Sequence, residues 1–309
     1  MISLACPFYN EAAVVDSFIE RVAIVMQSLG MAYEIVCVND GSTDDTLNLL
    51  RAHARINPAV RVIDLSRNFG KEAALSAAID HSRGAAVILI DADLQDPPEL
   101  IPEMIARWLS GNEVVLARRK DRSNDSWLKR STSHAFYRLH NVVAERPIPA
   151  DVGDFRLLDR KVVRAIQRLP ERRRFMKGLL SWVGFQTTIV DYVREPRAAG
   201  STKFSAWKLW NFALEGITSF STAPLRIWTY IGFVVAFASF CHGIFIVIYT
   251  LLGGVDVPGY ASLLTAILFL GGVQLIGIGV LGEYIGRIHA ESKQRPIYIV
   301  RSIYPHDVT

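Results

Sequence analysis

The first 120 residues alternate short apolar runs with longer stretches of mixed polarity, and this alternation restricts the fold more than any other feature of the chain. The runs predicted to be strands are Ile2–Cys6, Tyr33–Asn39, Val60–Leu65, Val87–Ile90 and Glu113–Ala117. The stretches predicted to be helices are 12–29, 44–56, 71–82 and 99–109. Repeated strand–helix units build a mostly parallel, doubly wound sheet with right-handed crossovers. The sequence therefore predicts an α/β domain in the first part of the chain.

The fourth predicted strand runs directly into an acidic segment. Alternate residues of an extended chain point to the same side, so Asp91, Asp93 and Gln95 can face one site. Pro97 and Pro98 end the strand and leave these side chains at the carboxyl edge of the sheet, where open α/β sheets bind ligands. Two carboxylates and an amide oxygen suit a hard cation such as Mg²⁺ or Mn²⁺, which in turn binds phosphate oxygens. A solvated acidic turn after a strand would have the same composition.

Polar loops also follow the first three predicted strands, at 7–11, 39–44 and 66–71. The second loop contains the glycine and the Ser, Thr and Asp residues that turn a chain and cap a helix. The third ends at Lys71, at the start of a predicted helix, which is a favourable position for an anion. Turn and cap chemistry explains any one of these loops alone. Because four successive strand ends carry polar loops, we favour a shared binding site at this edge.

Four motifs occur in the order Pro7-Phe-Tyr-Asn-Glu11, Asn39-Asp-Gly-Ser42, Asp91-Ala-Asp93-Leu-Gln-Asp-Pro-Pro98 and Gly153-Asp-Phe-Arg156. As a set, they resemble family 2 glycosyltransferases with the GT-A fold. More narrowly, their order and spacing are similar to those of polyprenyl-phosphate glycosyltransferases, which include the bacterial bactoprenol glucosyltransferases and the dolichol-phosphate mannose synthases. The resemblance covers roughly residues 1–205 and implies a GT-A, Rossmann-like catalytic domain with a mostly parallel sheet over residues 1–204.

The resemblance also implies roles for individual residues. Asp93 and Gln95 would bind the metal ion, Mg²⁺ or Mn²⁺, that bridges the donor diphosphate, and Asp91 would contact this metal or the ribose. Asp154 lies where the family has its acceptor-side carboxylate, so Asp93 and Asp154 are the predicted catalytic residues. The residues expected to hold the nucleotide-sugar are Pro7, Tyr9, Glu11, Asp40, Lys71, Asp91, Arg118, Arg197 and Lys203.

The expected chemistry follows from the charges involved. When a nucleotide-sugar loses its sugar, negative charge develops on the β-phosphate of the departing nucleoside diphosphate, and a divalent ion with arginine or lysine side chains stabilises that charge. The acceptor would attack the anomeric carbon from the far side, with inversion. A lipid phosphate has a second pKa of roughly 6, so it is already ionised near neutral pH. We therefore hypothesise that Asp154 orients the acceptor or relays a proton more than it acts as an obligatory base.

Basic residues are concentrated in the middle of the chain, at 118–122, 129–130 and 172–174. Arg118 and Arg130 lie near the predicted site, and we assign Arg130 to the acceptor phosphate. Arg197 and Lys203 match the basic loop that the family places over the diphosphate. The run 172–174 is either a solvated face or a contact with anionic lipid headgroups. The formal net charge is only +4 and the basic runs lack interleaved aromatic residues, so nucleic acid is not an expected partner.

The composition becomes apolar after residue 205. Apolar residues at helical spacing predict an amphipathic juxtamembrane helix over 205–223, although a soluble core helix would show a similar pattern. The stretches 228–252 and 260–281 are apolar and long enough to be two transmembrane helices. Their connection has no Lys or Arg, whereas Arg226, Arg287 and Lys293 flank the outer ends. Both termini are therefore predicted to be cytoplasmic, and we expect the tail at 284–309 to return along the catalytic domain or a neighbouring subunit.

Small residues in the second apolar stretch, Gly277, Gly279 and Gly282, match a dinucleotide-binding pattern, but no predicted strand precedes them. We interpret them as residues that allow close packing of membrane helices. The three cysteines form no disulfide framework, so nothing in the sequence requires an oxidising compartment.

These features predict a multi-pass enzyme of the bacterial inner membrane that transfers a hexose from a nucleotide-sugar to a polyprenyl phosphate at the cytoplasmic face. The resemblance makes UDP-glucose the first candidate donor and undecaprenyl phosphate the first candidate acceptor; GDP-mannose and a modified arabinose remain open. It also suggests a homotetramer. A polysaccharide synthase is the nearest enzymatic alternative, but that family has more membrane spans and a Q-x-x-R-W motif that this chain lacks. A non-catalytic membrane scaffold is the alternative from a different class.

Overall fold

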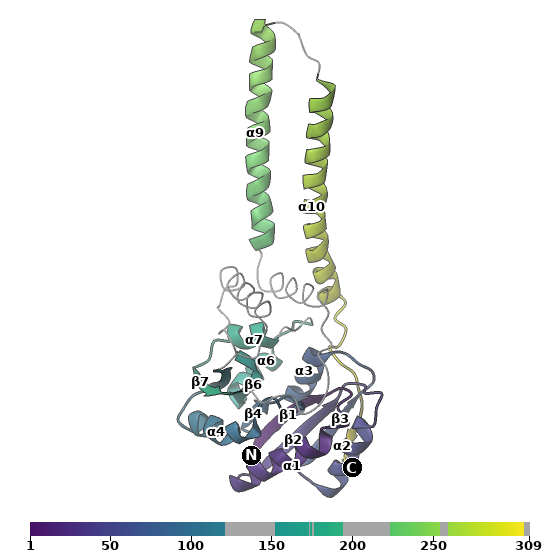
Figure 1. The fold of residues 1–309 in the computed structure, drawn as a ribbon, viewed down its shortest axis with the longest axis vertical. Coiled ribbons are helices and arrows are strands. Elements are labelled where there is room, and N and C mark those ends of the chain that lie inside the picture. Colours follow the sequence, from purple (N-terminus) through teal and green to yellow (C-terminus); the bar gives the residue numbers. More distant parts are fainter. Residues whose placement is uncertain (121–151, 173, 175, 194–222, 254–258, 306–309) are drawn as a thin grey trace. The chain divides into compact units, whose positions relative to one another are not determined.

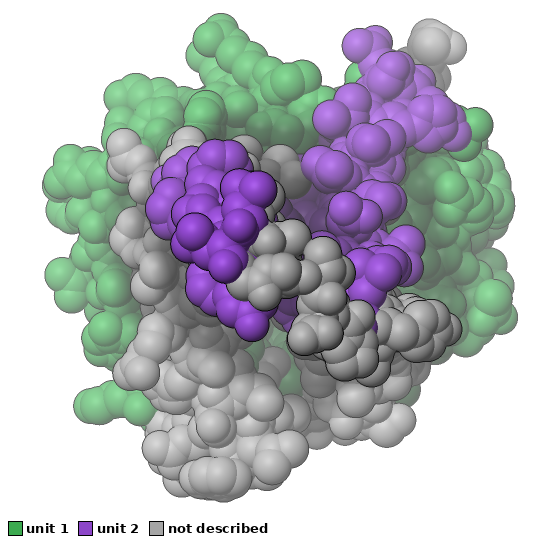
Figure 2. Space-filling model, turned by 90° about the horizontal axis from the view of Figure 1, so that it is seen from above, with its two compact units in different colours: residues 1–213, 295–309 green, residues 214–294 purple. Residues whose placement is uncertain are grey.

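The structure is a computed structural model, and it describes residues 1–120, 152–172, 174, 176–193, 223–253 and 259–305 (Figure 1). The chain forms two compact units, one of Met1–Ala213 with Arg295–Thr309 and one of Leu214–Gln294 (Figure 2). The C-terminal end of the chain therefore belongs to the same unit as the N-terminal domain.

The strands of the first unit are β1 (Ile2–Phe8), β2 (Tyr33–Asn39), β3 (Val60–Leu65), β4 (Ala86–Leu89), β5 (Val114–Arg119), β6 (Val152–Asp159), β7 (Thr187–Tyr192) and β8 (Val300–Tyr304). Its helices are α1 (Val15–Ser28), α2 (Thr46–Ile56), α3 (Lys71–His81), the 3-10 helix η1 (Pro98–Leu100), α4 (Ile101–Leu109), α6 (Arg160–Gln167) and α7 (Met176–Trp182). The five strands and four helices predicted for residues 1–120 are all present, with boundaries that differ by a few residues.

The strands form one sheet in the order β7-β5-β6-β4-β1-β2-β3-β8. Neighbours among β1 to β4 are parallel, as are β5 and β7, whereas β6 runs antiparallel to β4 and β5, and β8 runs antiparallel to β3. The predicted Rossmann-like α/β fold is confirmed, but the sheet is mixed. β6 lies between β4 and β5, which a simple strand–helix alternation does not predict.

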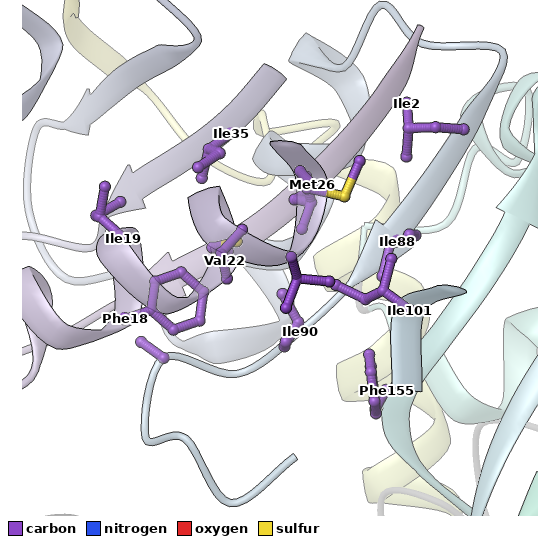
Figure 3. Close-up of a cluster of buried hydrophobic side chains, with 14 of the residues drawn as sticks. Ile2, Phe18, Ile19, Val22, Met26, Ile35, Ile88, Ile90, Ile101 and Phe155 are labelled. Atoms are coloured by element: carbon purple, nitrogen blue, oxygen red, sulfur yellow. The ribbon is translucent and has the colours of Figure 1, made fainter. Parts of the chain in front are cut away.

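One hydrophobic cluster covers a face of this sheet. Phe18, Val22 and Met26 of α1 are fully buried, at the spacing of three or four residues that places side chains on one side of a helix. They lie beside strand residues such as Ile35 and Ile88 (Figure 3). All four residues of β4 are 0% exposed, so both faces of this strand are covered. This explains why β4 is a continuous apolar run in the sequence rather than an alternation of apolar and polar residues.

The second unit contains two long helices, α9 (Ala223–Gly253) and α10 (Tyr260–Ser292). Pro224 lies in the first turn of α9, where the missing N–H of proline is not needed. α10 continues well beyond residue 281, so the segment from residue 284 begins as helix rather than as tail. A Cβ added at Gly277 would lie 3.7 Å from the Trp228 ring, which agrees with a packing role for this glycine.

Within the described residues, one helix segment, Phe269–Ser292, is long and apolar enough to cross a membrane by length and composition. Tyr230–Phe245 is a shorter apolar stretch of α9. Two transmembrane helices at 228–252 and 260–281 therefore stay a prediction. Most of the juxtamembrane helix predicted at 205–223 lies outside the described residues.

The C-terminal segment returns to the first unit. β8 pairs with β3, with Val62 opposite Tyr304 and Ile63 opposite Ile303. Of the two places predicted for the tail, the segment Val300–Tyr304 takes the first, along this unit. β8 also covers the edge of the sheet that β3 would otherwise leave unpaired.

Replacing Phe18 by Ala should destabilise the first unit by about 3–5 kcal/mol, because the ring is fully buried and packs edge-on against Phe8 at 5.5 Å. Ile24→Ala on the same helix is the control: Ile24 is 62% exposed, and its truncation should change stability by less than about 0.5 kcal/mol. Urea denaturation of the full chain in detergent, followed by near-ultraviolet circular dichroism, measures both. Equal midpoints for the two variants would contradict this account of the core.

Candidate active site

The carboxyl ends of four parallel strands meet at one edge of the sheet. Phe8 is level with Asn39, and Asn39 is level with Asp64. The loops after β1, β2, β3 and β4 therefore emerge side by side, at the edge where α/β sheets bind ligands. The predicted shared site at this edge is consistent with the fold.

The loop after β1 is fixed by the loop after β2. Asn10 has a positive φ of 52° and donates its N–H to Ser42 Oγ at 3.0 Å, and its own side-chain oxygen accepts from Thr43 N at 2.8 Å. Glu11 N donates to Thr46 Oγ1 at 2.9 Å. Polar residues of the loops after β1 and β2 thus serve as turn and cap groups. Tyr9 is 40% exposed, so its ring is accessible to a ligand.

Pro7 is part of β1 rather than of the following loop, because the strand extends to Phe8. A proline usually disrupts a central strand, since it has no N–H to donate. Here the pairing of β1 with β4 ends at Ala5, so no bond to β4 is lost at Pro7. The strand can therefore carry proline close to the site.

Asp40 holds two loops together. Asp40 is 2% exposed, and its carboxylate accepts hydrogen bonds from the N–H groups of Phe69 at 2.7 Å and Gly70 at 2.9 Å. Burial raises the pKa of Asp40 more than these hydrogen bonds and Arg67 lower it. A Cβ at Gly41 would lie 2.4 Å from the Asn68 nitrogen, so the loops are in close contact there. Any contact of Asp40 with the nucleotide stays a prediction.

Lys71, Asp91 and Asp154 form the centre of the site. The Lys71 ammonium lies 2.7 Å from Asp91 Oδ2 and 2.6 Å from Asp154 Oδ2. The Lys71 side chain is 47% exposed, Asp91 24% and Asp154 20%, so all three can be reached by a ligand. The sequence predicted each residue separately but not that one ammonium bridges both carboxylates.

Strand register explains why these two carboxylates meet. β6 is antiparallel to β4, and Leu89 lies opposite Arg156. Continuing this register by two residues places Asp91 opposite Asp154. Lys71 is the first residue of α3 and reaches this point from the loop after β3. The antiparallel strand, which the alternation pattern did not predict, is therefore what brings Asp154 to the acidic motif.

The positive charge of Lys71 is stabilised by the two carboxylates of this cluster. Burial lowers the pKa of Lys71, but the charges of Asp91 and Asp154 and their hydrogen bonds outweigh it and hold the pKa above its usual value. The lysine is therefore fully protonated at neutral pH, and it offsets the repulsion between the two carboxylates.

The acidic turn after β4 carries oxygen groups of the kind that bind divalent cations. Asp93 Oδ1 accepts the Gln95 N–H at 3.2 Å, and Leu94 between them has a strained positive φ of 57°. Among the described residues, no group of three or more His, Cys, Asp or Glu side chains is arranged to hold a metal ion. Mg²⁺ is commonly held by one or two carboxylates, with substrate phosphates and water completing its shell. Asp91, Asp93 and Gln95 offer oxygen ligands of the type that such an ion prefers, and their role as its ligands stays a prediction.

Arg118 does not follow the fifth strand as expected, because β5 extends to Arg119. Its guanidinium lies 2.7 Å and 3.0 Å from the two carboxylate oxygens of Asp191 on β7. Arg119, one residue on, points to the other side of the strand, and its guanidinium would lie 3.4 Å from a Cβ at Gly153, next to Asp154. The predicted role of Arg118 at a phosphate stays untested, and Arg119 is the arginine closer to the cluster.

Tyr192 connects Arg119 to the acidic turn. Arg119 Nε donates to the Tyr192 hydroxyl at 3.4 Å, and that hydroxyl donates to Asp96 Oδ1. The Tyr192 ring packs edge-on against Phe155, which follows Asp154, at 6.2 Å. Sequence reasoning missed both Arg119 and Tyr192. The only available signals were the alternation of side chains along β5 and the aromatic end of β7.

Three further predicted site residues, Arg130, Arg197 and Lys203, lie outside the described residues. Their assignments to the acceptor phosphate and the diphosphate stay predictions.

A Rossmann-like mixed sheet with an acidic turn after its fourth strand is the architecture of a GT-A glycosyltransferase. Residues 3–167 match the family described as glycosyl transferase family 2, and residues 223–288 match the GtrB C-terminal hairpin. The chain belongs to glycosyl transferase family 2 and is a glycosyltransferase.

Known relatives match along almost the whole chain. Identity to the bactoprenol glucosyl transferase of Shigella phage SfV is 56% over 301 residues, covering 97% of this chain and 98% of that protein. Identity to the prophage bactoprenol glucosyl transferase homolog of Escherichia coli strain K12 is 54% over 302 residues, covering 98% and 99%. The crystal structure of mannosyl-3-phosphoglycerate synthase from Rubrobacter xylanophilus shares the fold, with a TM-score of 0.50, 18% identity and 75% of each chain covered.

Replacing Asp154 by Asn should lower the pKa of Lys71, because one of the two carboxylates that stabilise its ammonium is lost. The fraction of neutral amine at pH 9 then rises, and Lys71 should react faster with acetic anhydride. Mass spectrometry of competitively acetylated protein measures this, with the exposed Lys293 as internal reference. An unchanged ratio of Lys71 to Lys293 labelling would contradict the bridge.

Proposed function

We propose that this glycosyltransferase transfers a hexose from a nucleotide-sugar to a polyprenyl phosphate, with glucose from UDP-glucose and undecaprenyl phosphate as the leading pair. One observation carries the proposal: Lys71 joins the acidic turn and the acceptor-side Asp154 into one charged centre. The bactoprenol glucosyl transferases that resemble the chain over both its catalytic domain and its hairpin support the choice of acceptor and sugar.

On the donor side, the acidic turn and the basic groups would hold the diphosphate. A divalent ion, Mg²⁺ or Mn²⁺, held by Asp93 and Gln95 with Asp91, would supply charge for the departing nucleoside diphosphate. Lys71 is the described cation closest to this turn, and it can contact the same phosphates. Tyr9, Glu11 and Asp40, with Pro7, lie in or beside the first two loops, where the base and ribose would bind.

On the acceptor side, an oxygen of the lipid phosphate attacks the anomeric carbon. The new C–O bond forms on the face opposite the leaving group, the bond to the β-phosphate oxygen breaks, and that oxygen keeps the electron pair. The configuration at the anomeric carbon is inverted, and the products are a lipid-phosphate sugar and a nucleoside diphosphate. No proton has to leave a phosphate that is already ionised, with a second pKa of roughly 6.

Asp154 is suited to orientation. Its carboxylate already shares the Lys71 ammonium with Asp91, so its position is fixed relative to the donor turn. Arg119 lies beside it and offers a cation for the acceptor phosphate. Arg130 remains our assignment for the same phosphate, together with Arg197 and Lys203 for the diphosphate.

The membrane arrangement completes the proposal. The chain would have the catalytic domain at 1–204, a juxtamembrane helix at 205–223, spans at 228–252 and 260–281, and a cytoplasmic C-terminal segment after α10. Both termini and the active site would face the cytoplasm of a bacterial inner membrane, where nucleotide-sugars occur. The apolar segment Phe269–Ser292 and the match to the GtrB hairpin support a membrane-bound enzyme. A homotetramer is proposed by resemblance.

A donor panel should show transfer from one nucleotide-sugar. Full-length protein in detergent, with undecaprenyl phosphate and Mg²⁺ or Mn²⁺, is offered labelled UDP-glucose, GDP-mannose and a UDP-linked modified arabinose, and label in an organic-extractable lipid is counted. Transfer should fall by about 10²–10³-fold in Asp93→Ala, because the metal ion that would stabilise the leaving charge loses a carboxylate ligand. Glu103→Ala, an exposed acidic residue on α4, is the control and should keep full activity.

The panel also decides between the alternatives. Label in a long insoluble polymer would indicate a polysaccharide synthase. Nucleotide binding without transfer from any donor would indicate a non-catalytic scaffold. Transfer that survives Asp93→Ala unchanged would contradict the assignment of the acidic turn.

A further inference from the structure

The C-terminal strand contacts the loop that leads into the active-site lysine. β8 pairs with β3, and just beyond this pairing Ser66 N donates to the Ile299 carbonyl at 2.9 Å. Ser66 begins the loop 66–70, which we call the β3–α3 loop and which ends at Lys71. The last strand of the chain and the donor side of the site are therefore directly connected.

Arg301 makes the side-chain contacts of this connection. One terminal nitrogen of its guanidinium donates to the Ser66 carbonyl, and the other lies 3.6 Å from Asp64 Oδ2. Asp64 is 1% exposed and accepts a hydrogen bond from the Asn39 side chain at 2.8 Å. Arg301 thus reaches the start of the β3–α3 loop and, through Asp64, the end of β2.

The β3–α3 loop is in turn the partner of Asp40. Phe69 N and Gly70 N both donate to the Asp40 carboxylate, and Asn68 Nδ2 donates to the Asp40 carbonyl at 3.2 Å. The loop then delivers Lys71 to Asp91 and Asp154. A displacement at Ser66 would therefore move Lys71 and also the contacts between the β3–α3 loop and Asp40.

A second contact of the tail lies at the C-terminal end of α3, the helix that begins with Lys71. The Tyr298 hydroxyl donates to Asp80 Oδ2 at 3.0 Å, and its ring lies 6.4 Å from His81, at the end of α3. The tail therefore contacts α3 at its C-terminal end as well as the loop that precedes Lys71.

We propose that Arg301 is a positioning residue for donor binding: the C-terminal strand, which follows the membrane hairpin in the chain, holds the β3–α3 loop in its nucleotide-binding conformation. This inference rests on the proposed function in one respect, that the loop serves a nucleotide. A strand that only protected the sheet edge would need no side chain contact with Ser66 and Asp64.

The test compares Arg301→Gln with Arg295→Gln in the full-length protein in detergent. Arg295 is an exposed arginine of the same tail and serves as the matched control. Two readouts are taken: hydrogen exchange of the Phe69 and Gly70 amides, and calorimetric titration with UDP and with GDP in the presence of Mg²⁺. Arg301→Lys is included because lysine keeps the charge but cannot contact both acceptors at once.

We expect faster exchange at Phe69 and Gly70 in Arg301→Gln. The dissociation constant of the nucleotide that the wild type binds should rise about three- to tenfold, a modest effect because the guanidinium is largely exposed. Arg301→Lys should lie between wild type and Arg301→Gln, and Arg295→Gln should match wild type. The KM for undecaprenyl phosphate and the thermal midpoint should not change.

Unchanged exchange in the loop would overturn the inference, and so would faster exchange with an unchanged dissociation constant. A fall in thermal midpoint with equal losses for nucleotide and lipid would indicate a purely structural contact and would also overturn it. Failure of the wild type to bind either nucleotide would instead contradict the proposed function, while the exchange result would still show whether Arg301 holds the loop.

Discussion

The bridge from Lys71 to Asp91 and Asp154 is the interaction on which the site depends. Two carboxylates brought to the same point repel each other, and an ammonium at 2.7 Å and 2.6 Å makes their proximity stable. Each partner comes from a different element: Asp91 follows the end of β4, Asp154 lies near the start of β6, and Lys71 is the first residue of helix α3. The donor and acceptor sides of the proposed reaction are thereby set relative to one another before any substrate binds.

The surrounding structure keeps these three groups in place. Below the site, β4 is buried on both faces, so the acidic turn begins from a rigid strand. On the donor side, Asp40 fixes the loop that ends at Lys71. On the other side, Tyr192 joins Asp96 and Arg119 next to Asp154. The proposed reaction needs charged groups in fixed positions more than it needs a base, because its acceptor is ionised and its difficulty is the charge on the leaving group.

The sequence predicted the local features well. The strands and helices of residues 1–120, the loops at the carboxyl edge and the acidic turn depend on residues close together in the chain. Two features were missed because they depend on pairing between distant segments: β6 between β4 and β5, and the Lys71 bridge, whose partners are 20 and 83 residues away. The prediction of Arg118 rather than Arg119 shows a further limit. Because the fifth strand was predicted to end at Ala117, the sequence did not show that both arginines belong to β5 and that their side chains point to opposite sides of the strand, with Arg119 on the side of Asp154.

The most direct test of the central claim, that this cluster positions charges rather than removes a proton, is the rate of sugar transfer by Asp154→Asn measured across pH. The wild-type rate should rise through a pH of roughly 6 as the lipid phosphate ionises and then level off. The variant should be slower by about a hundredfold with the same profile, because the acceptor is misplaced at every pH. A loss of activity that disappears as the pH is raised would show that Asp154 acts as a base and would contradict the account.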